Sequence, residues 1–171
     1  MSEHNTGDII ISSIGNSLAA LKEIDFELAY LALLTHEGLK PLSRWEKPLE
    51  DKKLQLLEEM SLLTKRVSRI LKTGREVQEN IFSRSFACID LYAKRFENKP
   101  VEKSPETQQF EGFLFGFPPC CIEQYIIKPY AANNLNEKDQ EILFHWACDN
   151  CKITPFLLDS YKKMFDLLEN L

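Results

Sequence analysis

Apolar residues recur at helical spacing over most of the chain. Ile14, Leu18 and Leu21 are separated by four and three residues, which places them on one face of an α-helix. A second apolar segment begins after Asp25, a residue type that caps helix N-termini, and it ends before Gly38, a residue type common at helix ends. The pattern predicts two consecutive helices at the start of the chain.

Two longer amphipathic segments follow. Pro48 suits the first turn of a helix, and apolar residues recur three and four apart from there to Ile70, shortly before Gly74. Apolar residues then form a broad stripe from Val77 to Phe96. The two segments predict an antiparallel pair of helices, and no segment alternates regularly enough to predict a strand.

The segment 98–109 contains two prolines and many charges but almost no large apolar residue, so it predicts a solvated linker. It would separate an N-terminal helical bundle, residues 1–97, from a C-terminal module, residues 110–171, within one compact domain overall. In the module, one helix is predicted to begin at the proline pair 118–119 and another after Asn136. The predicted fold class is therefore all-α: a helical bundle with a C-terminal Cys/His-containing helical module.

Composition and charge narrow the classes of partner. The chain has 171 residues, 44% of them apolar, and its 26 acidic residues exceed its 21 basic ones, for a net charge of -5. This balance disfavours a nucleic-acid partner. No apolar run approaches the roughly 20 residues that cross a bilayer, and the N-terminus lacks the features of a secretory signal. We expect a cytoplasmic protein with no membrane partner; its partners stay open, and a homo-oligomer is compatible with the sequence.

The cysteines carry the most distinctive chemistry of the chain. Four of the five fall in two tight pairs, Cys120-Cys121 and Cys148-x-x-Cys151, and His145 lies three residues before the second pair. In a reducing compartment such cysteines are more often metal-binding, catalytic or buried than part of a disulfide framework. The predicted metal site comprises Cys120, Cys121, His145, Cys148 and Cys151, and zinc is the expected metal because Cys and His are its usual structural ligands.

Five candidate ligands exceed the four that a structural zinc site needs. Cys120 and Cys121 fall in the first turn of a predicted helix, where adjacent side chains diverge by about 100°, so only one of them is expected to be an easy ligand. His145 and Cys148 are three residues apart on another predicted helix and would face one centre. The isolated Cys88 lies among apolar residues and is expected to be a core residue.

The two motifs together resemble a known family. The family's pattern is Gly, an aromatic residue, Pro, one variable residue and Cys-Cys, followed later by His-x-x-Cys-x-x-Cys. The residues that match it here are Gly116, Phe117, Pro118, Cys120, Cys121, His145, Cys148 and Cys151. This is similar to a prokaryotic family of unknown function, domain of unknown function 483, over about residues 112–160. The resemblance implies a bacterial or archaeal protein in which these residues act as a unit, and it implies no reaction, substrate or cofactor.

We therefore expect a zinc site with a structural or regulatory role. A first alternative is a thiol-based enzyme or redox protein that uses Cys120, Cys121 or the Cys148-x-x-Cys151 pair, because a helix N-terminus stabilises a thiolate. A second is an iron-sulfur protein, since the spacing of Cys88 and the two pairs is similar to that of the cysteine-rich domain of heterodisulfide reductases, although Ile122 replaces its glycine and the second gap is shorter. The sequence identifies no catalytic residue and leaves open whether the protein is an enzyme.

Overall fold

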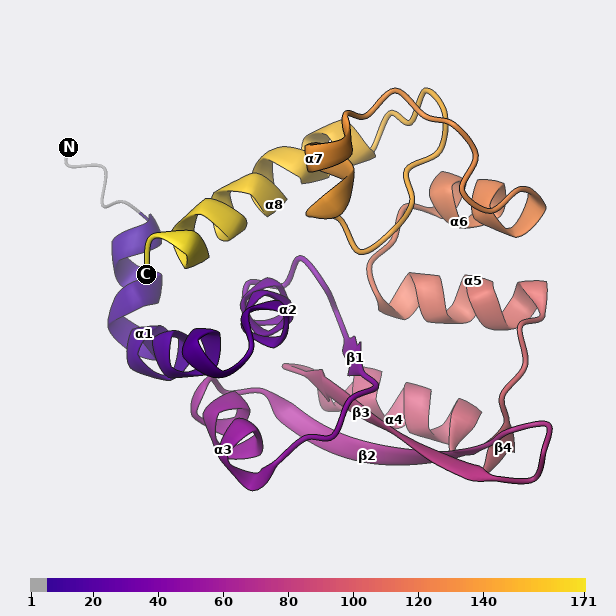
Figure 1. Ribbon diagram of the computed structural model, residues 1–171, viewed down its shortest axis with the longest axis horizontal. Helices are drawn as coiled ribbons and strands as arrows, with labels where there is room; N and C mark the ends of the chain where they lie inside the picture. The colour runs from indigo at the N-terminus through magenta and orange to yellow at the C-terminus, as the bar shows by residue number, and fades with distance from the viewer. Residues whose placement is uncertain (1–5) are drawn as a thin grey trace.

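The computed structural model describes residues 6–171, with side chains from Ile14 onward, and shows a mixed α/β fold (Figure 1). Residues 1–5 lie outside the described residues. They belong to the predicted N-terminal bundle and to the N-terminus that was expected to lack a secretory signal. The prediction of an all-α protein is wrong, because a four-stranded sheet occupies the middle of the chain. The helices are α1 (Thr6–Ile24), α2 (Phe26–His36), α3 (Asp51–Glu59), α4 (Phe86–Phe96), α5 (Pro105–Leu114), α6 (Pro119–Ile127), α7 (Glu137–Glu141) and α8 (Thr154–Glu169). The strands are β1 (Ser43–Trp45), β2 (Leu63–Ile70), β3 (Glu76–Ser83) and β4 (Lys99–Pro100).

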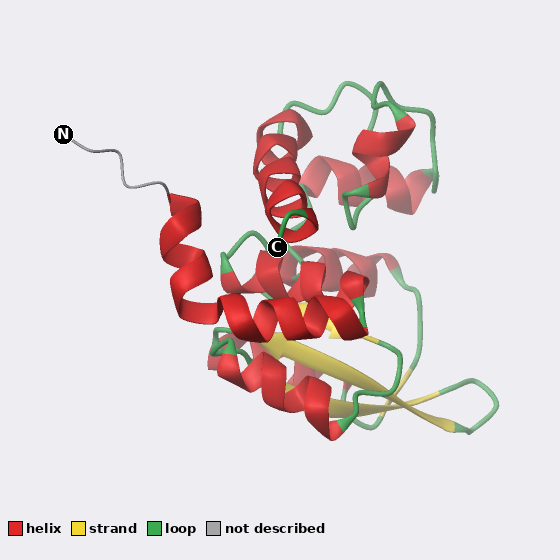
Figure 2. Ribbon diagram, turned by 60° about the vertical axis from the view of Figure 1, so that its left-hand side comes forward, coloured by secondary structure: helices red, strands yellow, loops and turns green. Residues whose placement is uncertain are grey.

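The helix α2 lies at the centre of the larger apolar core. Every residue from Leu28 to Thr35 is buried, as expected for a helix that is apolar on all sides. The Asp25 side chain caps this helix by accepting a hydrogen bond from the Leu28 N–H at 3.1 Å. Helices α1, α3 and α8 contribute most of the rest of this core, and Figure 2 shows α8 above the N-terminal helices. The first two predicted helices are confirmed.

The sheet has the strand order β1-β3-β2-β4, in which β2 and β3 form an antiparallel hairpin and β4 pairs with β2 in parallel. Gly74, with φ of +82°, lies in the turn of this hairpin, where the Gly74 N–H donates to the Leu71 carbonyl. Glycine serves both at hairpin turns and at helix ends, so its presence did not distinguish the two. A second apolar core, formed by β2, β3, α4 and α5, covers one face of the sheet.

The predicted pair of long helices between Pro48 and Phe96 is wrong in its central part, where β2 and β3 take the place of helix, whereas α3 and α4 lie within the two predicted segments. Several inward-facing positions of β2 and β3 are polar: Arg69 is only 2% exposed, and Glu79 and Asn80 are each 7% exposed. Buried polar residues hide the alternation that usually identifies a strand. The apolar residues that remain in β2, Leu63, Val67 and Ile70, recur four and three apart, which fits helical spacing as well.

These buried charges form one network beneath α4 and α5. The Arg69 guanidinium lies 3.5 Å from a Glu79 carboxylate oxygen and 3.3 Å from a Glu111 oxygen. Arg44 lies 2.8 Å from the same Glu111 oxygen, and the Tyr92 hydroxyl donates to Glu79 at 2.6 Å. Each buried charge is therefore compensated within the network, which is what burial of ionised groups requires.

The C-terminal part buries little apolar surface before α8 begins. Cys121 is the one buried residue of α6, and α7 has none. Asn136 caps α7 as predicted, by accepting from the Asp139 N–H at 2.9 Å, but α7 ends at Glu141 and the chain continues as a loop to Ile153. The segment 98–109 contains β4 and the first half of α5. No helix in residues 6–171 has the length and apolar character needed to cross a membrane.

Candidate metal centre

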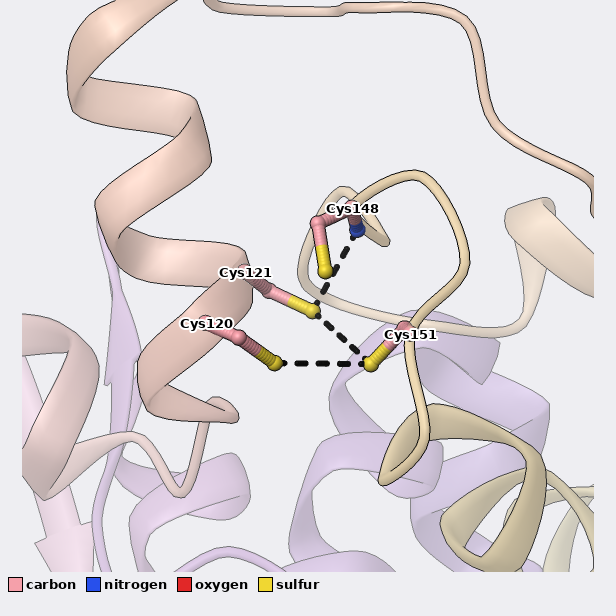
Figure 3. A group of neighbouring side chains, drawn as sticks. All are labelled: Cys120, Cys121, Cys148 and Cys151. Atoms are coloured by element: carbon pink, nitrogen blue, oxygen red, sulfur yellow. Dashed lines mark hydrogen bonds between the residues drawn. The ribbon is translucent and has the colours of Figure 1, made fainter.

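The first turn of α6 supplies two of the four neighbouring thiols. Gly116, with φ of +74°, ends the turn after α5, and Pro118 and Pro119 then start α6. Cys120 and Cys121 follow directly, so both lie at the N-terminal end of the helix. In Figure 3 both side chains extend from this end towards the loop that carries Cys148 and Cys151.

The loop between α7 and α8 supplies the other two thiols. The Cys151 Sγ lies 3.6 Å from the Cys120 Sγ and 3.5 Å from the Cys121 Sγ. All four sulfur atoms lie within 4.8 Å of one another, and Figure 3 shows them pointing into one space. The structure thus brings together Cys120, Cys121, Cys148 and Cys151, including both members of the vicinal pair.

This arrangement fits a single metal ion. The sulfur separations are far longer than the ~2.05 Å of a disulfide bond, and all four cysteines are free. Four thiolates around one tetrahedral zinc, at Zn–S distances of about 2.3 Å, would stand about 3.8 Å apart. The observed separations lie near that value. The four cysteines can therefore hold a metal ion.

Backbone N–H groups and one hydroxyl support the sulfur atoms. The Cys148 N–H donates to the Cys121 Sγ, and the Thr154 N–H donates to the Cys151 Sγ, each at 3.3 Å. The Thr154 hydroxyl lies 3.5 Å from the Cys121 Sγ. Hydrogen bonds of this kind stabilise thiolates and orient metal ligands.

His145 lies outside the group of sulfur atoms. Its Nε2 is 3.1 Å from the Thr154 Oγ1, so the imidazole reaches the thiols only through that hydroxyl. His145 and Cys148 do not share a helix as predicted, because both residues lie in the loop after α7. Burial, together with the charge of Lys40, lowers the pKa of His145 to about 4, so its ring is neutral at neutral pH.

The thiols differ in acidity when no metal neutralises them. Burial opposes ionisation of Cys151, but hydrogen bonds from Thr154 and its neighbours outweigh it and lower the Cys151 pKa to about 6. Burial raises the pKa of Cys121 to about 11, and it also raises the pKa of Cys148. A thiolate therefore forms readily at Cys151, whereas Cys121 and Cys148 retain their protons.

Thr154 is the supporting residue that the sequence did not identify. It is completely buried, and its side chain and N–H contact His145, Cys121 and Cys151. Its sequence position could have indicated this role, because it lies three residues after Cys151 and directly before Pro155, at the start of a helix. Cys88 packs against the second apolar core. It is distant in the sequence from the other four cysteines and does not belong to the group that their sulfur atoms form.

Comparison with known proteins adds no relative. No family model, no curated protein and no solved structure matches this chain. The chemical interpretation of the centre therefore rests on its own geometry.

Proposed function

We propose that Cys120, Cys121, Cys148 and Cys151 bind one zinc ion, and that this ion is a structural centre that fixes α6 against the loop preceding α8. The observation that carries the proposal is the convergence of four thiols from two separate segments within 4.8 Å. Zinc needs no redox partner and accepts four thiolates in a closed tetrahedral site. A reducing, cytoplasmic setting belongs to the proposal, because it keeps the thiols available.

The weak packing around the centre supports a structural role. Among the described residues α6 packs on α5, and it has no extensive packing against α7 or α8. Neither α6 nor α7 buries enough apolar surface to fix it against the loop before α8, since one residue of α6 and none of α7 is buried. Small segments without their own core commonly depend on a metal for stability.

A single ion suits the geometry better than a multi-iron cluster. In a cluster, iron and sulfide atoms separate the thiolates that bind different irons, so four thiolates cannot all stand as close together as around one ion. Here all four sulfur atoms lie within 4.8 Å of one another. A tetrahedral set of four thiolates is typical of zinc and of a single iron, and colour separates these two metals.

Elemental analysis and a visible spectrum of anaerobically purified protein test the proposal. We expect about one zinc per chain and no absorption in the visible range. Replacing Cys148→Ser and Cys151→Ser together should abolish zinc binding, whereas the control Cys88→Ser should retain it. Brown, iron-containing protein, or a metal-free protein after anaerobic purification in zinc-containing medium, would overturn the assignment.

The acidity of Cys151 favours thiol redox chemistry as a second candidate. Hydrogen bonds lower its pKa to about 6, and the Cys120 and Cys121 sulfurs lie within 3.6 Å of it. A thiolate beside a second thiol can form a disulfide when an oxidant is supplied. This candidate requires metal-free protein that forms a reversible disulfide with Cys151, so the elemental analysis distinguishes it from zinc binding.

The affinity for zinc is expected to fall steeply as the pH is lowered. At neutral pH the metal-free Cys121 and Cys148 thiols are protonated, because burial raises both pKa values, to about 11 for Cys121. Zinc must displace these protons, so binding should release at least two protons per ion and weaken as pH falls. Calorimetry at pH 7 in buffers of different ionisation enthalpy measures the release. Binding without proton release would show that the thiols are not ligands.

A further inference from the structure

A large cavity lies directly beside the candidate metal centre. Its volume is about 940 Å³, within the size range of small-molecule sites. Its walls come from α5, α6, α7 and the loops on either side of α7, and Cys121 and His145 lie in the wall nearest the metal centre. In Figure 1 α5 and α6 lie at the end of the molecule away from α1, and α7 lies nearer the middle of the view. The zinc centre as proposed needs no such space.

Three aromatic side chains form one wall of this cavity. The Tyr130 ring packs edge-to-face between Tyr125 and Trp146, with centroid distances of 5.2 and 5.4 Å. The Trp146 indole N–H donates to the Ala131 carbonyl at 2.7 Å, which fixes that ring. Perpendicular rings present their electron-rich faces in different directions, and such faces attract cations.

Tyr130 occupies this wall despite an unfavourable backbone conformation. Its φ is +56°, a left-handed conformation that bulky residues rarely adopt, and the residue is 68% exposed. Strain of this kind persists where the surrounding contacts hold the residue in place, and it is concentrated at binding sites. The ring contacts with Tyr125 and Trp146 are the contacts that hold it.

The charges around the cavity favour a positive ligand. The carboxylates of Glu111, Glu137 and Glu141 line it, together with the positive side chains of Arg44 and Lys103. Glu111 is already paired with Arg44 and Arg69, so Glu137 and Glu141 remain against Lys103. Arg44 is already neutralised, because three carboxylates lie within 4.0 Å of its guanidinium nitrogens. The net charge of the cavity lining is therefore negative, so the cavity attracts cations and repels anions.

His145 offers a hydrogen-bond acceptor. Its ring lies in the cavity wall, and its Nδ1 is buried without a partner. If the thiols are metal-bound thiolates, the Thr154 hydroxyl donates to the Cys121 sulfur and accepts from the His145 Nε2–H, which leaves a lone pair on Nδ1. This step rests on the proposed metal centre, whereas the rings and the carboxylates do not. A buried acceptor without a donor is unfavourable, and a ligand N–H would satisfy it.

We propose that this cavity binds a small organic cation, a protonated amine carried on a body that packs against the Tyr125, Tyr130 and Trp146 rings. The carboxylates of Glu137 and Glu141 attract the ammonium group, the ring faces stabilise its charge, and Nδ1 of His145 accepts one of its N–H groups. The metal centre holds the wall that contains Cys121 and His145, so the site is a ligand pocket built against a structural ion.

The test uses phenethylamine as the probe and the indole N–H signal of Trp146 as the readout, in nuclear magnetic resonance spectra of the full-length protein. The variant Trp146→Phe assigns the signal. We expect a saturable shift with phenethylamine and at least ~10-fold weaker binding of the uncharged phenylethanol and of the anion phenylpropionate, as a cation–π and carboxylate site requires. Equal binding of phenylethanol, or no saturable shift with ~10 mM phenethylamine, would overturn the proposal.

Variants at exposed carboxylates locate the site without disturbing the core. The double variant Glu137→Gln and Glu141→Gln should weaken phenethylamine binding by ~5-fold or more, because it removes two attractive charges. The matched control, Glu23→Gln and Glu58→Gln, removes the same charge from exposed positions on α1 and α3 and should bind as the wild type does. Equal affinities of the two double variants would contradict binding in this cavity.

Two further measurements separate this proposal from the metal assignment. Two-bond proton–nitrogen spectra should show His145 protonated at Nε2, with an Nδ1 signal that moves when phenethylamine is added; an unmoved signal overturns the role of His145. Zinc is measured in the same samples. If the protein contains zinc but does not bind phenethylamine, the cavity proposal alone is overturned. If the protein is metal-free but binds phenethylamine, the cavity proposal is supported and the proposed function is overturned.

Discussion

Removal of the metal is expected to release α6 and the loop between α7 and α8 while the rest of the protein stays folded. Amide hydrogen exchange of residues 119–127 and 142–153 should accelerate by ~100-fold or more when a chelator is added, which corresponds to a loss of ~2.7 kcal/mol of local stability. The physical reason is that the four cysteines supply the main link between these segments, since α6 buries one residue and α7 none.

The rest of the chain provides the internal control for this experiment. Amides of α2 and of the β2–β3 hairpin should keep their protection, because their cores are apolar and independent of the cysteines. Adding zinc back should restore the exchange of 119–127 and 142–153 to its slow rate. If these segments remain protected in metal-free protein, the ion is not a structural centre.

Breaking the buried ion network is expected to give the second large effect. The change Glu79→Ala removes a carboxylate that accepts from Arg69 and Tyr92, and it leaves the 2%-exposed Arg69 with one partner fewer. Loss of one member of a buried ion pair costs about 3–5 kcal/mol. Urea denaturation should therefore show a lower free energy of unfolding by about that amount, with an unchanged slope.

The neighbouring Glu46 supplies a matched control for Glu79. Glu46 also pairs with an arginine, at 3.1 Å from Arg44, but its side chain is largely exposed. The change Glu46→Ala should cost less than ~1 kcal/mol, because exposed ion pairs contribute little. Replacing Arg69→Met and Glu79→Leu together should cost less than the two single changes combined, since no unpaired charge remains. A small effect of Glu79→Ala would mean that water reaches the network.

The helices that could be predicted from the sequence are those whose apolar surface matches a helical repeat. Helix α2 has its cap at Asp25 and a continuous apolar segment, and α6 begins at a proline pair, so both were identified close to their observed bounds. The hairpin β2–β3 could not be identified, because Arg69 and Glu79 face inward, where strands normally carry apolar residues. Buried charge depends on partners distant in the sequence, such as Glu111 of α5.

The short length of α7 also depends on contacts that a local pattern does not contain. Its cap was predicted, but the Gln140 side chain donates to the His145 carbonyl at 2.8 Å and accepts from the Ala147 N–H at 3.3 Å. Asn133 donates to the Ala147 carbonyl at 3.0 Å. These side chains satisfy the loop backbone, so it needs no helical hydrogen bonds to be stable.

The thiols of the candidate site were predictable by residue type and spacing, but their geometry was not. Side chains of adjacent residues diverge along the side of a helix, which argued against joint use of Cys120 and Cys121. The loop instead meets α6 at its end, where both thiols lie in the first turn and both reach the Cys151 sulfur. The position of a helix end relative to a distant loop is a tertiary property.

X-ray absorption at the zinc edge tests the central claim most directly, because it counts and identifies the atoms bound to the ion. The zinc ion in the purified protein should be bound by four sulfur atoms at about 2.3 Å and by no nitrogen atom. The reason is that His145 is hydrogen-bonded to Thr154 and lies outside the group of sulfur atoms. A shell containing an imidazole nitrogen, fewer than four sulfur atoms, or protein without zinc would contradict a four-cysteine structural centre.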